Sequence, residues 1–143
     1  MDTCYENGIL CIRMNDGDDF FESLKDALAR YDVRSGVVLS GVGMFRDITV
    51  NYFRGDGYNE RHLPEPHEVV SITGSIAPDA GTGEVLPHIH CALAGGDNVV
   101  MGGHLSRATV NVLLELFIQS VAGGLMRREI NPSNGLKELR LVE

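Results

Sequence analysis

The residues best suited to chemistry in this 143-residue chain are three histidines in two nearby segments. His88 and His90 are separated by one residue, and His104 follows the glycine pair Gly102-Gly103. Neutral imidazole is the commonest side-chain ligand of transition metals, and it dominates near pH 7 because its ordinary pKa is about 6.5. The spacing therefore indicates a metal site, although pairs of histidines also occur on strands as hydrogen-bonded residues without a metal.

Three histidines without an obvious fourth ligand predict an open coordination position, which is typical of catalytic rather than structural zinc. Zinc is the first candidate for imidazole ligands, and nickel, copper or iron would also suit them. An open zinc site lowers the pKa of bound water to about 7, so hydrolysis or hydration would be the natural reaction. Whether the protein is an enzyme stays open, because no acid or base group is placed beside the metal by the sequence.

The histidines can bind one ion only if they share one face of a sheet. Residues 85–93 have the composition of a strand, and residues two apart on a strand point to the same face. His88 and His90 therefore project together, while Cys91 points the opposite way and is predicted to belong to the core. The two adjacent imidazoles supply two of the three expected ligands.

The third ligand depends on the register of a hairpin. A second strand is expected over residues 99–105, after the turn Gly95-Gly96-Asp97-Asn98. If a three-residue loop makes His90 pair directly with His104, all three rings share a face. A register shifted by one residue would turn His104 to the other side, unless a bulge at Gly102-Gly103 corrected it.

Glu115 is the candidate for a catalytic acid or base. It lies within an apolar segment, residues 109–121, where a carboxylate without a partner is costly to bury. It could bind the metal, hydrogen-bond a histidine ligand or act as a general base. A solvent-facing position on a half-exposed strand explains it equally well, so both interpretations stay open. Arg127-Arg128 is predicted to be a small basic spot at the end of a strand.

One helix is predicted near the N-terminus. Apolar side chains recur there at helical spacing, at Phe20, Leu24, Ala27, Leu28 and Tyr31. Asp19 is expected to cap the helix N-terminus, with Glu22 completing a capping box, and Gly36 follows the end of the periodic run.

The rest of the chain is predicted to be mostly sheet. Strands are expected over residues 9–14, 37–44, 48–52, 69–76, 85–93, 99–105, 109–121 and 136–142. Residues 54–66 are polar and contain prolines, which predicts a loop. The spacing in residues 109–121 would also fit a helix, but alternating β-branched residues favour a strand. The expected fold class is α+β, with a mostly antiparallel sheet and one main N-terminal helix.

The composition predicts a single globular domain over residues 1–143, with 43% hydrophobic residues and a formal charge of -8. An acidic surface repels phosphate backbones and disfavours nucleic-acid binding. The three cysteines are an odd number without a CxxC spacing, which argues against a disulfide framework and for a reducing compartment. Without a signal-peptide pattern or an apolar run of about 18 residues, the sequence predicts a soluble cytoplasmic protein.

The sequence resembles the plants-and-prokaryotes-conserved (PPC) domain, also described as a PD1-like DNA-binding family, over nearly the whole chain. The segments that carry the resemblance are Ser35-Gly36-Val37-Val38, Gly41-Val42-Gly43, residues 68–76 (EVVSITGSI), Pro87-His88-Ile89-His90, Gly102-Gly103-His104-Leu105 and Glu115. The HxH and GGHL pieces in this order and spacing are the specific part.

The resemblance implies a compact α+β domain that assembles as a homotrimer. It also implies that His88, His90 and His104 match positions that hold a metal, usually zinc, in stand-alone prokaryotic members. Plant members carry AT-hooks, short Arg-Gly-Arg-Pro segments that insert into the minor groove, and this sequence has none.

Three hypotheses follow. The leading one is a cytoplasmic, trimeric metal-binding protein of undetermined biochemical role that could take a small-molecule ligand at the metal. The alternative is a DNA-binding regulatory module without an AT-hook, against which the acidic charge weighs. The third is an assembly domain in which the metal only stabilises the trimer.

Overall fold

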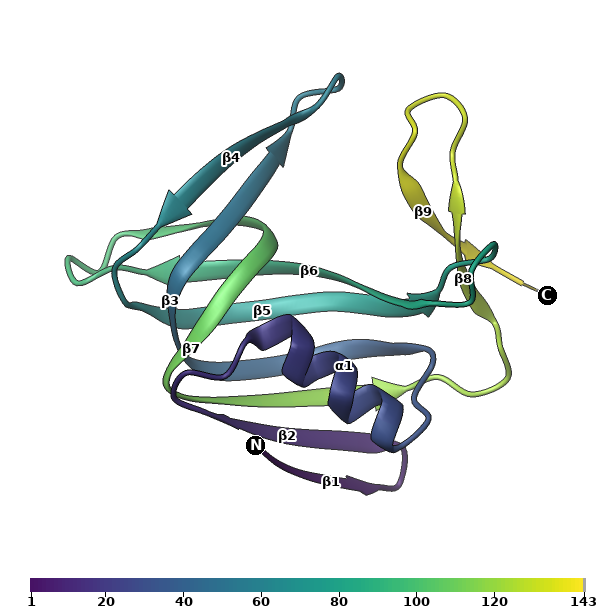
Figure 1. Ribbon diagram of the computed structural model, residues 1–143, viewed down its shortest axis with the longest axis horizontal. Coiled ribbons are helices and arrows are strands. Elements are labelled where there is room, and N and C mark those ends of the chain that lie inside the picture. Colours follow the sequence, from purple (N-terminus) through teal and green to yellow (C-terminus); the bar gives the residue numbers. More distant parts are fainter. Residues whose placement is uncertain (143) are drawn as a thin grey trace.

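A computed structural model describes residues 1–142, and most of them lie in strands (Figure 1). In chain order the elements are β1 (Asp2–Glu6), β2 (Ile9–Asn15), α1 (Phe20–Arg30), β3 (Gly36–Phe53), β4 (Tyr58–Leu63), β5 (His67–Pro78), β6 (Val85–Ala94), β7 (Val100–Ser120), β8 (Met126–Ile130) and β9 (Lys137–Leu141). β1 to β7 form one antiparallel sheet, and β8 and β9 form a separate hairpin. The α+β class with a mostly antiparallel sheet is confirmed.

The long strand β7 organises the sheet by pairing with three different strands. It pairs with β6 at its start, with β2 near its end and with β3 along most of its length. The strand order is β1-β2-β7-β6-β5-β3-β4, and β3 also pairs with β7. The strands β7, β6, β5 and β3 therefore form a closed circuit of pairings. The bent strand β7 carries His104 at one end and Glu115 near the other, so the two residues lie in different parts of the sheet.

Helix α1 covers the lower part of the sheet in Figure 1 and closes the core. Its apolar stripe is buried, and the ring of Phe20 packs edge-on against Phe45 of β3 with centroids 5.3 Å apart. The carboxylate of Asp19 accepts hydrogen bonds from the backbone N–H groups of Phe21 and Glu22, so the predicted N-cap is confirmed. Among residues 1–142, no helix has the length and apolar character needed to cross a membrane.

The β6–β7 hairpin has the register on which the three-histidine prediction depends. His90 pairs directly with His104, and Cys91 pairs with Gly103. The alternation of β6 buries Cys91 in the core, as predicted, while His88 and His90 lie on the opposite, exposed face. In the connecting loop, the carboxylate of Asp97 accepts a hydrogen bond from the N–H of Val99 at 3.0 Å and shapes the turn.

Two glycines allow the strands around the histidines to approach closely. A Cβ atom on Gly74 of β5 would overlap the carbonyl oxygen of His88, and one on Gly102 would overlap the carbonyl oxygen of Cys91. Neither glycine has a positive φ, so space rather than backbone conformation excludes a side chain at these positions.

Five features of the strand prediction were wrong or incomplete. Residues 54–66 were expected to be a loop, but they contain β4, which pairs with β3. Five of the six side chains of β4 are exposed, so the strand depends on backbone pairing and carries no apolar alternation. β1 and β8 were not predicted, and the last strand, β9, falls within the expected residues 136–142. β3 and β7 are each one continuous strand where two strands were predicted. Register shifts in the pairing of β3 with β7 interrupt the alternation of side chains on which the prediction relied.

Candidate metal centre

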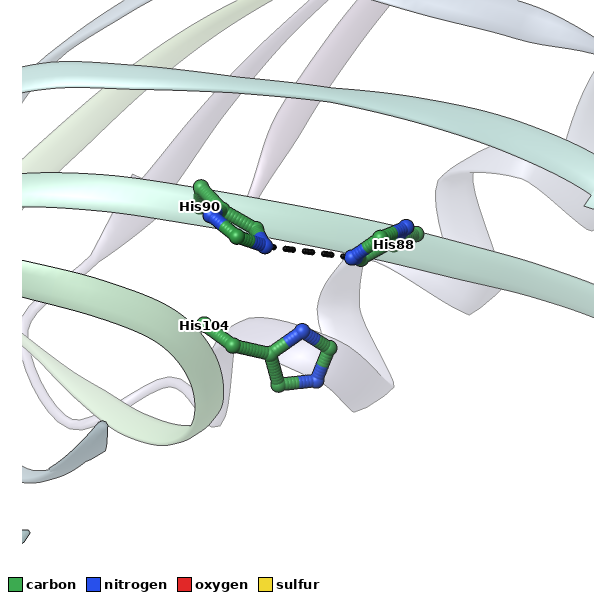
Figure 2. A group of neighbouring side chains, drawn as sticks. All are labelled: His88, His90 and His104. Atoms are coloured by element: carbon green, nitrogen blue, oxygen red, sulfur yellow. Dashed lines mark hydrogen bonds between the residues drawn. The ribbon is translucent and has the colours of Figure 1, made fainter. Parts of the chain in front are cut away.

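Three histidine rings gather on one face of the sheet, two from β6 and one from the neighbouring strand β7 (Figure 2). Each ring offers one nitrogen, and the three nitrogens of His88, His90 and His104 all lie within 4.8 Å of one another. Nε2 of His88 is 3.1 Å from Nε2 of His90, and the ring centroids are 5.0 to 5.4 Å apart. The two strands thus place three potential ligand atoms around a common point.

The donor set fits a divalent transition metal. In a tetrahedral zinc site with Zn–N bonds of about 2.0–2.1 Å, ligand nitrogens are separated by about 3.3–3.4 Å. The 3.1 Å between His88 and His90 is close to this separation, and 4.8 Å, the upper limit for the set, is within the reach of side-chain rotation. All three donors are imidazoles, which suit zinc, copper, nickel and iron.

The protonation of the rings also suits metal binding. Although the ring of His88 keeps solvent access, its partial desolvation among neighbouring groups lowers its pKa to about 4, helped by the positive charge of Arg128 and by repulsion from the other two histidines when they are protonated. Burial also lowers the pKa of His104, with smaller contributions from His90 and Arg128. Both rings are therefore neutral near pH 7, the form in which imidazole binds a metal.

His104 of β7 lies between β6 and β3, and each of these strands places a polar residue directly opposite it. On one side is His90 of β6, and on the other is Asn51 of β3, its direct cross-strand partner. Oδ1 of Asn51 is buried and has no hydrogen-bond partner within the described chain. Side chains directly opposite each other share a face, so Asn51 lies on the same face of the sheet as His104.

A cavity of about 530 Å³ opens beside His88 and His104. Two hairpins reach it, β3–β4 through Tyr58 and β8–β9 through residues 136–139, and both rise on the same side of the molecule in Figure 1. The ring of Tyr58 lies 5.9 Å from that of His104. The histidines are therefore part of the wall of a space large enough for a small ligand.

Sequence comparison identifies the family. The profile of the Plants and Prokaryotes Conserved domain, abbreviated PCC or PPC, matches residues 1–122. The chain belongs to this family. The resemblance inferred from the HxH and GGHL segments is confirmed, whereas no curated protein matches the sequence.

Solved structures share the PPC fold along nearly the whole chain. A protein from Bacteroides thetaiotaomicron, whose name supposes DNA binding, has a TM-score of 0.89 at 20% identity and covers 98% of this chain and 96% of its own. A PPC protein from Pyrococcus horikoshii has a TM-score of 0.85 at 21% identity, covering 99% and 95%. A metal-containing protein from Archaeoglobus fulgidus has a TM-score of 0.83 at 25% identity, covering 100% and 99%.

The β8–β9 hairpin follows the part of the chain matched by the PPC profile, and it supplies a group that sequence reasoning missed. Arg128 was predicted to be a basic spot at a strand end, but its side chain is only 4% exposed and lines the cavity. Its Nη2 donates to Oγ of Ser75 at 2.7 Å and to the Ser75 carbonyl oxygen at 3.2 Å. The only sequence signal was the spacing of Met126 and Arg128, which share the buried face of a five-residue strand.

Glu115 lies away from the histidines of its own chain. In β7 it pairs with Arg13 of β2 and Val42 of β3, and its side chain is exposed. It lines a different cavity, together with Cys4 and Cys11. The solvent-facing interpretation of this residue therefore fits the single chain better than a position beside its own histidines.

Proposed function

We propose that this PPC protein binds one divalent transition metal per chain through His88, His90 and His104, with zinc as the first candidate. The observation that carries the proposal is the convergence of three ring nitrogens within 4.8 Å on two strands whose register keeps them on one face. The Archaeoglobus fulgidus structure, described as a metal-containing protein, supports it. The proposed biochemical role is binding of a small molecule at this centre.

The position of the site supports a ligand-binding role over a purely structural one. Structural zinc sites are closed by four protein ligands, whereas this cluster has three and borders a cavity. A bound metal would supply Lewis acidity toward an oxygen atom of water or of a ligand. The chain itself supplies a partly apolar enclosure, because Leu86 and Pro87 line the cavity beside His88.

Metal analysis tests the proposal. The wild-type protein, stripped with a chelator and reloaded, should retain about one zinc per chain. H88A, H90A and H104A should each lose most of it, since one of three ligands is removed. H62A is the matched control, because His62 is an exposed histidine on β4 outside the cluster. Full zinc retention by all three cluster variants would refute the proposal.

We further propose that the protein assembles as a homotrimer through the outer face of the sheet. The adjacent strands β3 and β7 expose large apolar side chains there, namely Val37, Leu39, Val42, Val112 and Phe117. Several large apolar side chains exposed on two paired strands are typical of an interaction site. Light scattering after gel filtration should give about three times the chain mass of 15.6 kDa, and V42D should shift the protein toward the monomer.

Assembly is also the route by which Glu115 could act at a metal centre. Its carboxylate lies on the proposed interface face, beside Val42, and outside the histidine cavity of its own chain. A role as acid or base would therefore require the centre of a neighbouring protomer. E115Q should then change ligand binding only at concentrations at which the trimer forms, and an effect on the monomer would contradict this role.

DNA binding is the second candidate, supported by the name of the Bacteroides thetaiotaomicron relative. The net charge of -8 opposes it, because duplex binding depends on neutralising phosphates with basic side chains. A duplex titration at low ionic strength tests this candidate, and binding that falls steeply with added salt would favour it.

The free cysteines, Cys4, Cys11 and Cys91, agree with a protein that works in the reducing cytoplasm.

A further inference from the structure

The β8–β9 hairpin places a buried cation in the wall of the histidine cavity. The backbone of Arg128 is held at the end of β5, where its carbonyl oxygen accepts the N–H of Ala80 at 2.9 Å. Its side chain reaches Ser75 of β5, which is the direct cross-strand partner of His88. The guanidinium therefore lies one strand away from a proposed metal ligand.

The charge of Arg128 has no counterion in the described chain. Within residues 1–142 no carboxylate forms an ion pair with it, and its Nε is buried without a hydrogen-bond partner. A guanidinium has five N–H donors, but the acceptors that it meets are the two neutral oxygens of Ser75. A buried cation is costly unless it is paired, so an anionic partner is missing from this site.

The other charged groups in the cavity wall already have partners. Nζ of Lys137 lies 2.6 Å from the carboxylate of Asp79. The carboxylate of Glu138 accepts hydrogen bonds from the side-chain amides of Asn131 and Asn134 at 2.8 and 3.0 Å. Arg128 is therefore the cavity group that stays without a charge partner, and a divalent metal on the histidines would add positive charge beside it.

We propose that Arg128 is the anion-binding residue of the histidine cavity and that the natural ligand is a small organic carboxylate. This inference rests on the proposed function for the metal-side contact, whereas the contact to Arg128 can be measured without a metal. The planar guanidinium matches a carboxylate in shape and charge. The remaining walls, which include Leu86, Pro87 and Leu136, suit an apolar body attached to the carboxylate. A volume of about 530 Å³ admits a molecule of that size.

Benzoate is the probe for a carboxylate with an apolar body, acetate is the probe without one, and inorganic phosphate tests the other common oxyanion. Each is titrated into the zinc-loaded and metal-free protein and followed by amide NMR shifts. Benzoate should bind more tightly than acetate and phosphate. R128Q should weaken benzoate binding roughly ten- to a hundredfold, the range for a lost hydrogen bond to a charged group. R128K keeps the charge but not the planar guanidinium, so its benzoate affinity should lie between those of the wild type and R128Q.

R127Q is the matched control, because it removes the same charge from an exposed neighbour on the same strand. It should change benzoate affinity less than threefold. Equal affinity of wild type and R128Q for benzoate would overturn the proposal, as would tighter binding of phosphate than of benzoate. Should R128Q fail to fold, the Nε–H signal of Arg128 in the wild-type protein decides instead, because it should shift on benzoate addition and stay unchanged if the proposal is wrong.

Zinc content measured on each sample separates the two proposals. Normal zinc loading together with equal benzoate affinity of wild type and R128Q would support the metal site and refute the proposed carboxylate subsite. Absent zinc loading would remove the metal site, and benzoate binding by the metal-free protein would then decide the role of Arg128 alone.

Discussion

Gly102→Ala should disturb both the fold and the proposed metal centre, because the added methyl group enters a close approach of β6 and β7. It would lie 2.9 Å from the carbonyl carbon of Cys91 and 3.0 Å from Cα of Ala92, and it would overlap the Cys91 carbonyl oxygen. Ordinary contact begins near 3.4 Å, so β6 must retreat by about 0.5 Å, and by more to clear the oxygen. Backbone atoms on a paired strand cannot move this far without disturbing the ladder.

The size of this shift decides what it does to the metal centre. Metal–ligand distances tolerate about 0.2 Å, so a displacement of 0.5 Å or more between the strands that carry His90 and His104 exceeds the tolerance. Overpacking of a close contact costs about 1–3 kcal/mol, which corresponds to roughly 3–10 °C in Tm for a chain of this size. Zinc affinity should fall by about 10–100-fold, as when a group supporting a ligand is lost.

The assay is a pair of thermal melts, with and without excess zinc, together with a zinc titration. Gly96→Ala is the matched control, since a Cβ there meets nothing within 4 Å and the glycine lies in the same hairpin. The control should stay within about 0.5 kcal/mol of the wild type and bind zinc normally. A G102A protein that melts and binds zinc like the wild type would show that the close approach of β6 and β7 does not control the site.

Three further predictions concern single side chains. Lys137 beside Asp79 holds the pKa of that carboxyl below its usual value, so its stabilisation is present above about pH 4 and is lost as the carboxylate protonates at lower pH. D79N should therefore lower Tm at pH 7, and the difference from wild type should close in acid. D19A should cost about 0.5–2 kcal/mol in urea denaturation through the lost N-cap. Burial and the thiol of Cys4 raise the pKa of Cys11, so at pH 8 iodoacetamide should alkylate Cys11 more slowly than it alkylates the amino acid cysteine in solution.

The parts of the fold that were predictable are those with a local pattern. Helix α1 could be located because its buried stripe recurs at helical spacing behind Asp19, a residue that caps it as expected. That His90 and His104 share a face could be predicted for one register of the β6–β7 hairpin, because both residues belong to this hairpin and its turn allows only a few registers. In both cases the decisive interactions join residues close in sequence.

The remaining parts could not be predicted because long-range pairing creates them without a local signal. β4 exposes almost all of its side chains, so no alternation marks it, and its residues read as a polar loop until pairing with β3 is known. β8 buries Met126 and Arg128 on one face, but two residues are too short a pattern to tell an inward arginine from an exposed one. Arg128 becomes informative only when Ser75 is placed beside it.

Glu115 shows that a carboxylate within an apolar strand segment need not lie near the site. Parity correctly places a residue on one face of its strand, but it carries no information about where along a long strand the face meets the rest of the site. β7 runs from Val100 to Ser120, and its pairing partner changes from β6 to β2 between His104 and Glu115. A shared strand therefore does not imply a shared site. The histidine cluster depends on the local geometry of the β6–β7 hairpin, whereas its cavity depends on the hairpins β3–β4 and β8–β9, which only the tertiary structure brings to it. Substitutions in β3–β4 and β8–β9 should therefore change ligand affinity more than they change metal affinity.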